Sequence, residues 1–315
     1  MNIIYGQIYE KLLSAQRIVL VAHKNPDGDT LGAVTGLLYW LNDIGKSAIP
    51  FCASAVPEEY DFLYGISRFT SDPKVFLGAD LVCVLDAGTL SHAGVADYID
   101  EEDRPRIVNI DHHNVNDQYG IINLVESKAS STSEVIYRLV KSFGMRFNPE
   151  SATSLLTGII TDTSFFVNAA TSTETMAAAG EMLGSGAEYN KIYRRLFKNK
   201  SLLAISLWGK ALERLSFNSE YGIATTAIKL SDYEGKEGEE AMEGITNYLC
   251  ATLKVPIILA LREVAGGKVK GSLRTVTDID VSAFAKALGG GGHKKAAGFT
   301  IDGRLEGNEN GWSVV

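Results

Sequence analysis

The chain has 315 residues, of which 45% are hydrophobic, enough for two domains with sizeable cores. Its formal net charge of −8 argues against non-specific coating of nucleic acid, so a polyanion must bind locally through a few basic groups or metal ions. The cysteines Cys52, Cys83 and Cys250 lack CxxC spacing, which indicates neither a disulfide framework nor a zinc knuckle and favours a reducing cytoplasm.

The N-terminal residues 1–16 mix polar and apolar side chains, which predicts an amphipathic helix rather than a signal peptide. No window reaches the roughly 18 consecutive apolar residues that a membrane span needs. We therefore expect a soluble, cytoplasmic protein with no membrane partner.

Residues 17–22 (RIVLVA) predict a buried strand, and the stretch HKNPDGDTLG that follows reads as a loop at the end of that strand. Thr30 is expected to cap the next helix, which ends at Gly45.

His23, Asp27 and Asp29 therefore lie at the carboxyl end of a strand, where open α/β sheets bind ligands. Two carboxylates so close together repel each other unless a cation or a shared proton lies between them. An ordinary turn rich in Pro, Asp and Gly explains this stretch equally well when it is taken alone.

Strands and helices alternate up to about residue 185, which predicts a mostly parallel sheet flanked by helices. Further strands are expected at 79–86 and 104–111, and helices at 131–144 and 149–162. We assign residues 1–187 to this first domain. Residues 188–217 form a long helical pattern with one charged face, which is typical of a connector between domains.

A smaller α/β domain is expected over residues 218–303. It contains candidate strands and helices, and it ends in a loop with four consecutive glycines, whose small size lets backbone approach a ligand. The strands are expected at 221–230, 255–264 and 268–275, and the helices near 239–253 and 280–289. The polar, glycine-rich tail 304–315 is expected to be disordered.

Three further acidic residues repeat the placement of the first group. Asp86 and Asp111 end predicted strands, and Asp162 closes a predicted helix. Asp111 also opens the triplet DHH, with His112 and His113. Local turn chemistry explains one such residue but not a whole series in a chain with five histidines, so we expect these side chains to meet at one edge of the sheet.

The stretches HKNPDGDT, VLDAG, IDHHNVN, GIITDTSFF and GGGGHKKAAGF occur in this order over roughly residues 15–302. They resemble the successive motifs of DHH phosphoesterases with a DHHA1 domain, and among these most closely the oligoribonuclease and pAp phosphatase group. The resemblance implies two divalent metal ions, usually Mn²⁺, which suits mixed oxygen and imidazole ligands. It assigns His23 and Asp27 to one ion, Asp29, His112 and Asp162 to the other, and Asp86 to both.

The resemblance also implies catalytic and substrate-binding residues. Besides Asp86, the catalytic residues are His113, as a donor to the substrate phosphate, and Asp111, which orients a histidine or backbone. His92 matches no ligand position and is expected to be structural or exposed. In the second domain a forked guanidinium suits a phosphate, and the candidate substrate-binding residues are Arg274, His293, Gly291, Gly292, Ser272 and Asn247.

Two positions depart from the family pattern, Ser164 in place of a common glycine and Ala170 in place of an asparagine. These two departures leave the expected metal ligands unchanged, but they leave the identity of the substrate undetermined. We expect a two-metal phosphohydrolase that degrades very short RNA and dephosphorylates 3′-phosphoadenosine 5′-phosphate (pAp), with no long duplex as partner and a homodimer as one possible assembly.

Alternative substrates are linear or cyclic dinucleotides and polyphosphate. A different class is a nucleotide or RNA binder without turnover, which the retention of all six ligands disfavours.

Overall fold

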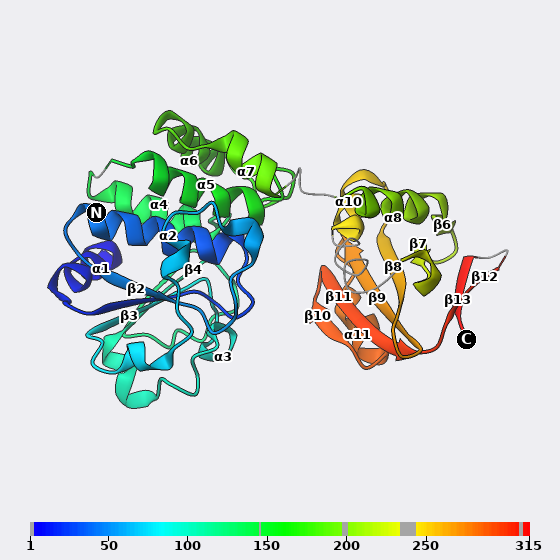
Figure 1. The fold of residues 1–315 in the computed structure, drawn as a ribbon, viewed down its shortest axis with the longest axis horizontal. Coiled ribbons are helices and arrows are strands. Elements are labelled where there is room, and N and C mark those ends of the chain that lie inside the picture. The colour runs from blue at the N-terminus through cyan, green and yellow to red at the C-terminus, as the bar shows by residue number, and fades with distance from the viewer. Residues whose placement is uncertain (1–2, 145, 197–200, 234–243, 309–310) are drawn as a thin grey trace. The chain divides into compact units, whose positions relative to one another are not determined.

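The computed structural model describes residues 3–144, 146–196, 201–233, 244–308 and 311–315. The chain forms two compact units, Met1–Lys198 and Asn199–Val315 (Figure 1). Residues 188–217 do not form a single connector, because helix α7 (Tyr189–Leu196) belongs to the first unit and α8 (Leu202–Glu213) to the second.

The first unit contains a five-stranded sheet in the order β2-β1-β3-β4-β5, with every neighbouring pair parallel. The predicted parallel sheet is thus confirmed, while β2 and β5 were not predicted. Because β1 has β2 on one side and β3 on the other, the chain reverses its direction of travel across the sheet between β1 and β3. Ligands bind at such a switch point in open α/β sheets. The strands are β1 (Ile18–Val21), β2 (Ala48–Phe51), β3 (Leu81–Leu85), β4 (Ile107–Asp111) and β5 (Ile122–Val125).

Both faces of this sheet are buried, which explains the continuous apolar runs in its sequence. Along β1, Ile18 and Leu20 contribute to one core, while Val19 and Val21 contribute to the core on the other face. Helices α2, α4 and α5 lie on one side of the sheet and α3 on the other (Figure 1). Besides α7, the α-helices described in this unit are α1 (Ile3–Ser14), α2 (Gly28–Asp43), α3 (Leu90–Ala93), α4 (Thr132–Ser142), α5 (Pro149–Asp162) and α6 (Thr173–Gly184).

Helices α2 and α5 pack unusually closely because glycines face their contact. A Cβ atom on Gly32 would lie 2.5 Å from the Ser154 carbonyl oxygen, and one on Gly158 would lie 2.7 Å from Asp29 Oδ1. A side chain fits at neither position without moving backbone or a buried carboxylate. This close approach brings Asp29, in the first turn of α2, to the end of α5 that carries Asp162.

The second unit contains a six-stranded sheet in the order β10-β11-β9-β8-β7-β6, in which only β7 and β8 pair in parallel. Helices α8 and α10 (Ile245–Thr252) contribute to the core on one face, and α11 (Val281–Ala287) to the core on the other. The smaller α/β domain is therefore confirmed. Its strands are β6 (Ser216–Asn218), β7 (Ile223–Ile228), β8 (Ile257–Val264), β9 (Lys268–Thr275), β10 (Gly291–His293) and β11 (Ala296–Asp302).

Two sequence-based expectations for the end of the chain are wrong. The glycine-rich segment is a β-hairpin rather than a loop, since β10 pairs with β11. The tail is ordered as a second hairpin of β12 (Leu305–Asn308) and β13 (Gly311–Val314), because Leu305 is buried and Trp312 packs beside it. Of the helix expected near 239–253, the part before residue 244 lies outside the described residues.

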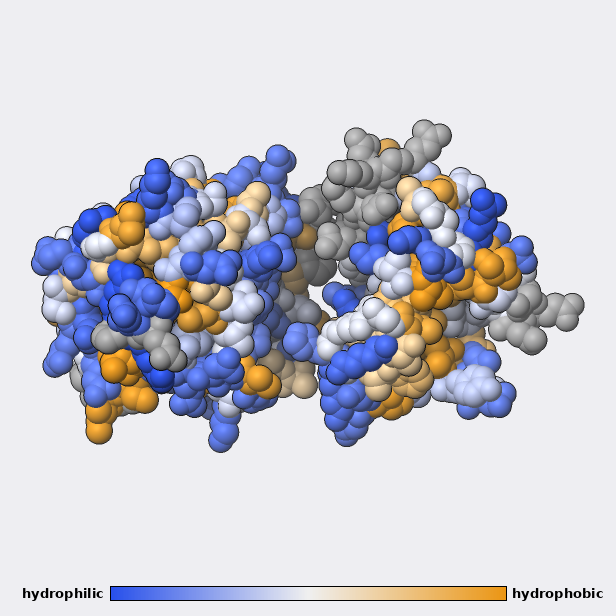
Figure 2. Space-filling model, turned by 90° about the horizontal axis from the view of Figure 1, so that it is seen from below, coloured by the Kyte–Doolittle hydropathy of each residue, from blue (hydrophilic) through white to orange (hydrophobic). Residues whose placement is uncertain are grey.

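None of the helices in the described ranges is long and apolar enough to cross a bilayer. On the face drawn in Figure 2, hydrophilic residues lie among several groups of apolar residues.

Helix α5 ends in a Schellman motif whose left-handed position is a serine. Ser164 N donates to Thr161 O over 3.1 Å, and Phe165 N donates to Ile160 O over 2.8 Å. The φ angle of Ser164 is +50°, and Phe165 and Phe166 follow at +61° and +65°. A glycine is the residue that this position favours.

We predict that Ser164→Gly stabilises the protein by about 0.5–1 kcal/mol, because relief of the left-handed strain exceeds the entropy cost of glycine. Urea denaturation measures the change in the free energy of unfolding. The matched control is Ser185→Gly at the end of α6, where φ is −85° and the same substitution should destabilise. Equal effects of the two substitutions would contradict the assignment of strain to Ser164.

Candidate metal centre

His23 follows β1 and directs one ring nitrogen into the site. Its Nδ1 lies 3.0 Å from the Lys24 carbonyl oxygen and donates to it. Its Nε2 lies 3.6 Å from Asp27 Oδ1 and 3.5 Å from Asp86 Oδ2. A histidine whose Nδ1–H is bonded to a carbonyl presents Nε2 as an electron-pair donor, the usual arrangement of a metal-binding imidazole.

Asp27, and not Thr30, caps helix α2, so the predicted cap is wrong. Asp27 Oδ1 accepts from the backbone N–H groups of Asp29 (3.0 Å) and Thr30 (3.1 Å). The Thr30 hydroxyl instead accepts from His23 N over 3.1 Å and donates to Leu85 O over 3.2 Å. Thr30 thus ties the end of β1 to the end of β3.

Asp29 is buried, and the amino end of helix α4 holds its carboxylate. Thr132 N donates to Oδ2 over 2.6 Å, and Ser133 N donates to Oδ1 over 2.9 Å. The positive end of a helix dipole stabilises a carboxylate in this position. We did not predict Thr132 and Ser133; the Ser-Thr-Ser-Glu sequence indicates a helix start but not its distant partner.

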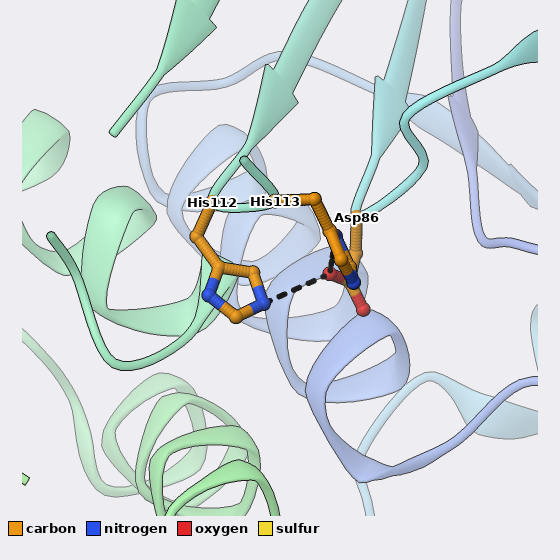
Figure 3. A group of neighbouring side chains, drawn as sticks. All are labelled: Asp86, His112 and His113. Carbon is orange, nitrogen blue, oxygen red and sulfur yellow. Dashed lines mark ion pairs between the residues drawn. The ribbon is translucent and has the colours of Figure 1, made fainter. Parts of the chain in front are cut away.

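Asp86 lies between two groups of side chains. Its Oδ2 faces His23, whereas its Oδ1 lies 3.7 Å from His112 Nε2 and 3.6 Å from His113 Nδ1 (Figure 3). Thr132 Oγ1 donates to the same Oδ1 over 2.9 Å. The two oxygens of Asp86 therefore point to different neighbours.

His112 completes the second group. Its Nδ1 lies 3.4 Å from Ala129 O, and its Nε2 lies 3.6 Å from Asp162 Oδ2 and 4.0 Å from Asp29 Oδ2. Within each candidate group the ligand atoms lie within 4.8 Å of one another; the groups are His23–Asp27–Asp86, Asp29–His112–Asp162 and Asp86–His112–His113. The first two groups bring together the same residues that the resemblance assigns to the two ions.

Asp111 orients His113. His113 Nδ1 lies 2.8 Å from Asp111 Oδ1, which also accepts from His112 N over 2.8 Å, and Asn116 Nδ2 donates to Oδ2 over 2.7 Å. The bond to Asp111 raises the pKa of His113. Burial raises the pKa of Asp111, but the bonds from His113 and Asn116 outweigh it, so that pKa is lowered overall. Asn116 is a further contributor that we did not predict.

The carboxylates of the site repel one another. Burial, followed by the charges of Asp29 and Asp27, raises the pKa of Asp162 to about 8. Burial and the same two charges raise the pKa of Asp86 well above its ordinary value. Carboxylate oxygens with imidazole nitrogens are a donor set that fits a divalent first-row cation, and such a cation would offset this repulsion.

His92 does not belong to any of these groups, yet it lies beside them. Its ring stacks on the His23 ring with a centroid distance of 4.7 Å. It is exposed, as expected, whereas His23 is buried.

Two of the substrate-binding candidates, Arg274 on β9 and Asn247 on helix α10, are in direct contact. Arg274 Nε donates to Asn247 Oδ1 over 2.8 Å, and Nη1 donates to Leu273 O over 2.9 Å. Burial lowers the pKa of Arg274. The guanidinium is therefore fixed in orientation while Nη2 has no bonded partner among the residues described.

Strand register places most of the other candidates on the same face of the second sheet. Arg274 pairs with Ala296, which pairs with His293, and Ser272 pairs with Gly298, which pairs with Gly291. Directly paired residues share a face, so the side chains of Arg274, Ser272 and His293 lie on one face of the sheet. The residues between them on β11 are the small Ala296 and Gly298. Gly292 occupies the alternate position of β10, on the other face. Its φ angle is +139°, and a Cβ at this position would lie 2.6 Å from Ala296 O.

Comparison with known proteins identifies the family of this chain. Residues 17–159 match the DHH family N-terminal domain, and residues 223–310 match the DHHA1 domain. The chain is 32% identical over 289 residues to the bifunctional oligoribonuclease and PAP phosphatase NrnA of Thermus thermophilus, covering 91% of this chain and 84% of the relative. It is 29% identical over 295 residues to the protein of that name from Bacillus subtilis, covering 90% and 89%.

A crystal structure of an exopolyphosphatase-related protein from Bacteroides fragilis matches with a TM-score of 0.86 and 25% identity, over 95% of this chain and 91% of that one. The fold, the two matched domains and the relatives agree with one another. The chain is therefore a phosphoesterase, and so a hydrolase, of the DHH family with a DHHA1 domain.

Proposed function

We propose that this protein is a two-metal phosphohydrolase that degrades very short RNA to mononucleotides and removes a phosphate from pAp. The observation that carries the proposal is the place of Asp86 between two Asp and His groups: it belongs to the His23–Asp27–Asp86 group, and its Oδ1 lies 3.7 Å from His112 Nε2 of the Asp29–His112–Asp162 group. The names of the relatives from T. thermophilus and B. subtilis support the choice of substrates.

In this proposal His23 and Asp27 would hold one ion, Asp29, His112 and Asp162 would hold the other, and Asp86 would serve both; the proposed ion is Mn²⁺. Two such cations would supply an activated water and offset charge on the phosphate oxygens. The protein contributes fixed ligand positions, because backbone N–H groups hold Asp27 and Asp29. His113, held by Asp111, donates a hydrogen bond from its free Nε2 to the phosphate.

In the second unit, we propose that the face with Arg274, Ser272, His293 and Gly291 binds the anionic substrate. Arg274 Nη2 provides the donor, and Asn247 fixes its direction. Gly292 contributes through its backbone. The cytoplasmic location and the homodimer remain predictions.

We expect Mn²⁺-loaded protein to hydrolyse an RNA dinucleotide and pAp rapidly while a long single-stranded RNA is spared. Asp86→Ala should lower turnover by more than about 100-fold, because loss of even an outer partner of a metal ligand commonly costs about 10- to 100-fold. Product analysis by chromatography measures both.

Absence of hydrolysis of both the RNA dinucleotide and pAp would overturn this choice of substrates. Tripolyphosphate belongs in the same assay, because the B. fragilis relative is exopolyphosphatase-related. A non-catalytic binder predicts instead that Asp86→Ala keeps pAp affinity and that the wild type shows no turnover on any substrate.

The raised pKa of Asp162 makes stability depend on pH and metal. Because folding raises this pKa from 3.8 to about 8, the neutral group favours the metal-free fold below pH 4, and that contribution is lost as the pH rises through 8. We predict that Asp162→Asn stabilises the metal-free protein at pH 8, on the order of 1 kcal/mol, and has little effect at pH 4.

The same variant should lose most of the stabilisation that Mn²⁺ gives the wild type at pH 8. Thermal unfolding in EDTA and in Mn²⁺ measures both effects, and Asp97→Asn, at an exposed carboxylate outside the site, is the control with equal charge change. Undiminished stabilisation of Asp162→Asn by Mn²⁺ would remove Asp162 from the ligand set.

The Thr132 hydroxyl offers a test of Asp86 orientation. Thr132→Val removes the donor to Asp86 Oδ1 while keeping shape and the backbone bond to Asp29. We predict that Mn²⁺ affinity falls about tenfold. Thr132→Ser keeps the hydroxyl and should retain affinity, so calorimetric titrations that show equal losses for both variants would refute a role for the hydroxyl.

A further inference from the structure

The structure holds His92 against the metal centre through its backbone. Thr89 Oγ1 caps helix α3 by accepting from His92 N over 3.0 Å, and Lys24 N donates to His92 O over 3.0 Å. Lys24 is the residue after His23, so the short helix is tied directly to the end of β1. The position of the His92 side chain is therefore fixed relative to His23.

The His92 ring lies between solvent and the site. It stacks on His23 at 4.7 Å with an interplanar angle of 16°, and it meets the ring of His113 edge-on at 6.3 Å and 90°. His23 is only 6% exposed, whereas His92 is exposed, so His92 covers one face of the buried imidazole and lies beside the ring of His113. The ring nitrogens of His92 have no hydrogen-bond partner among the residues that the structure describes.

A purely structural cover for His23 does not require these properties. Any flat ring packs against an imidazole, but only a polar ring keeps an N–H donor at the surface of the site. The ionisable groups that act on His92 are the imidazoles of His23 and His113 and the carboxylates of Asp111 and Asp27, and the two carboxylates disfavour an anionic substrate. A donor at this position, beside His113, would offset part of that repulsion for a phosphate.

We propose that His92 is a substrate-contacting residue that donates a ring N–H to a non-bridging oxygen of the phosphate under attack. This inference rests on the proposed function, and it adds a second imidazole donor beside His113. No proton is transferred in this contact, so the role of His92 is to bind and orient the phosphate.

The decisive variants separate stacking from hydrogen bonding. His92→Phe keeps a flat ring over His23 but removes the donor, whereas His92→Gln keeps a donor and removes the ring. We expect His92→Phe to retain Mn²⁺ affinity within about twofold and to lower kcat/KM for pAp about 10- to 100-fold, the range for a hydrogen bond to a charged group. His92→Gln should recover part of kcat/KM, and Ser91→Ala, at an exposed neighbour, should change nothing.

Wild-type kcat/KM in His92→Phe would overturn the proposal. So would a loss of Mn²⁺ affinity as large as the loss of kcat/KM, because His92 would then only support His23. Calorimetric binding of orthophosphate to the Mn²⁺-loaded protein provides a readout without turnover. If the wild type hydrolyses neither pAp nor RNA, the proposed function fails, yet weaker orthophosphate binding by His92→Phe still supports the contact and unchanged binding refutes it.

Discussion

Mutual repulsion among crowded carboxylates is the constraint on which this site depends. Asp29 and Asp86 are buried, whereas Asp162 is partly exposed and Asp27 is exposed, and the charges of Asp27, Asp29 and Asp162 all act on Asp86. Backbone N–H groups of the protein offset part of this repulsion. The first turn of α2 donates to Asp27, and the amino end of α4 donates to Asp29. Asp29, Asp86 and Asp162 nevertheless have raised pKa values, so protons or cations must supply the remainder. A site built in this way is destabilised when it is empty and ionised, and a bound divalent cation would offset that cost.

The fold delivers these groups through two features. The strands of the first sheet are parallel, so the loops that follow them emerge together at one edge, and His23 and Asp86 follow β1 and β3, the two strands at the topological switch. The close packing of α2 on α5 then determines how near Asp29 comes to Asp162. Since a Cβ on Gly158 would collide with Asp29 Oδ1, small residues at this contact position the ligands as well as the helices.

Much of this could be predicted because the decisive signals are local. Apolar runs ending in Asp or His indicated the parallel strands and the edge where side chains gather, and the DHH-type motifs indicated candidate ligands that the structure places close together. The remainder depends on contacts between distant segments. Thr132 meets Asp29 across 103 residues, so no local pattern names the pair. The cap of α2 was misassigned to Thr30 because both Asp and Thr are common N-cap residues. The hydrogen bond from the Thr30 hydroxyl to Leu85 O, at the end of β3, is a distant contact that the local sequence does not reveal. The tail was misjudged because Leu305 and Trp312, two apolar residues in a polar segment, suffice to fix a hairpin against the core.

The two adjacent histidines of the DHH triplet show how strongly the environment determines a side chain's chemistry. His112 directs Nδ1 to the carbonyl of Ala129, which leaves its Nε2 as a lone pair facing Asp162. His113 directs Nδ1 to the carboxylate of Asp111, and the resulting rise in its pKa favours a protonated ring with a donor at Nε2. Asp111 can support the second role because Asn116 and the backbone of His112 hold it in the ionised form. One residue thus presents an electron pair and the next a proton, and the difference arises from the oxygen that each Nδ1 meets. Among the residues that the structure describes, no oxygen bonds the His92 ring nitrogens, which leaves them available for the substrate contact that we propose.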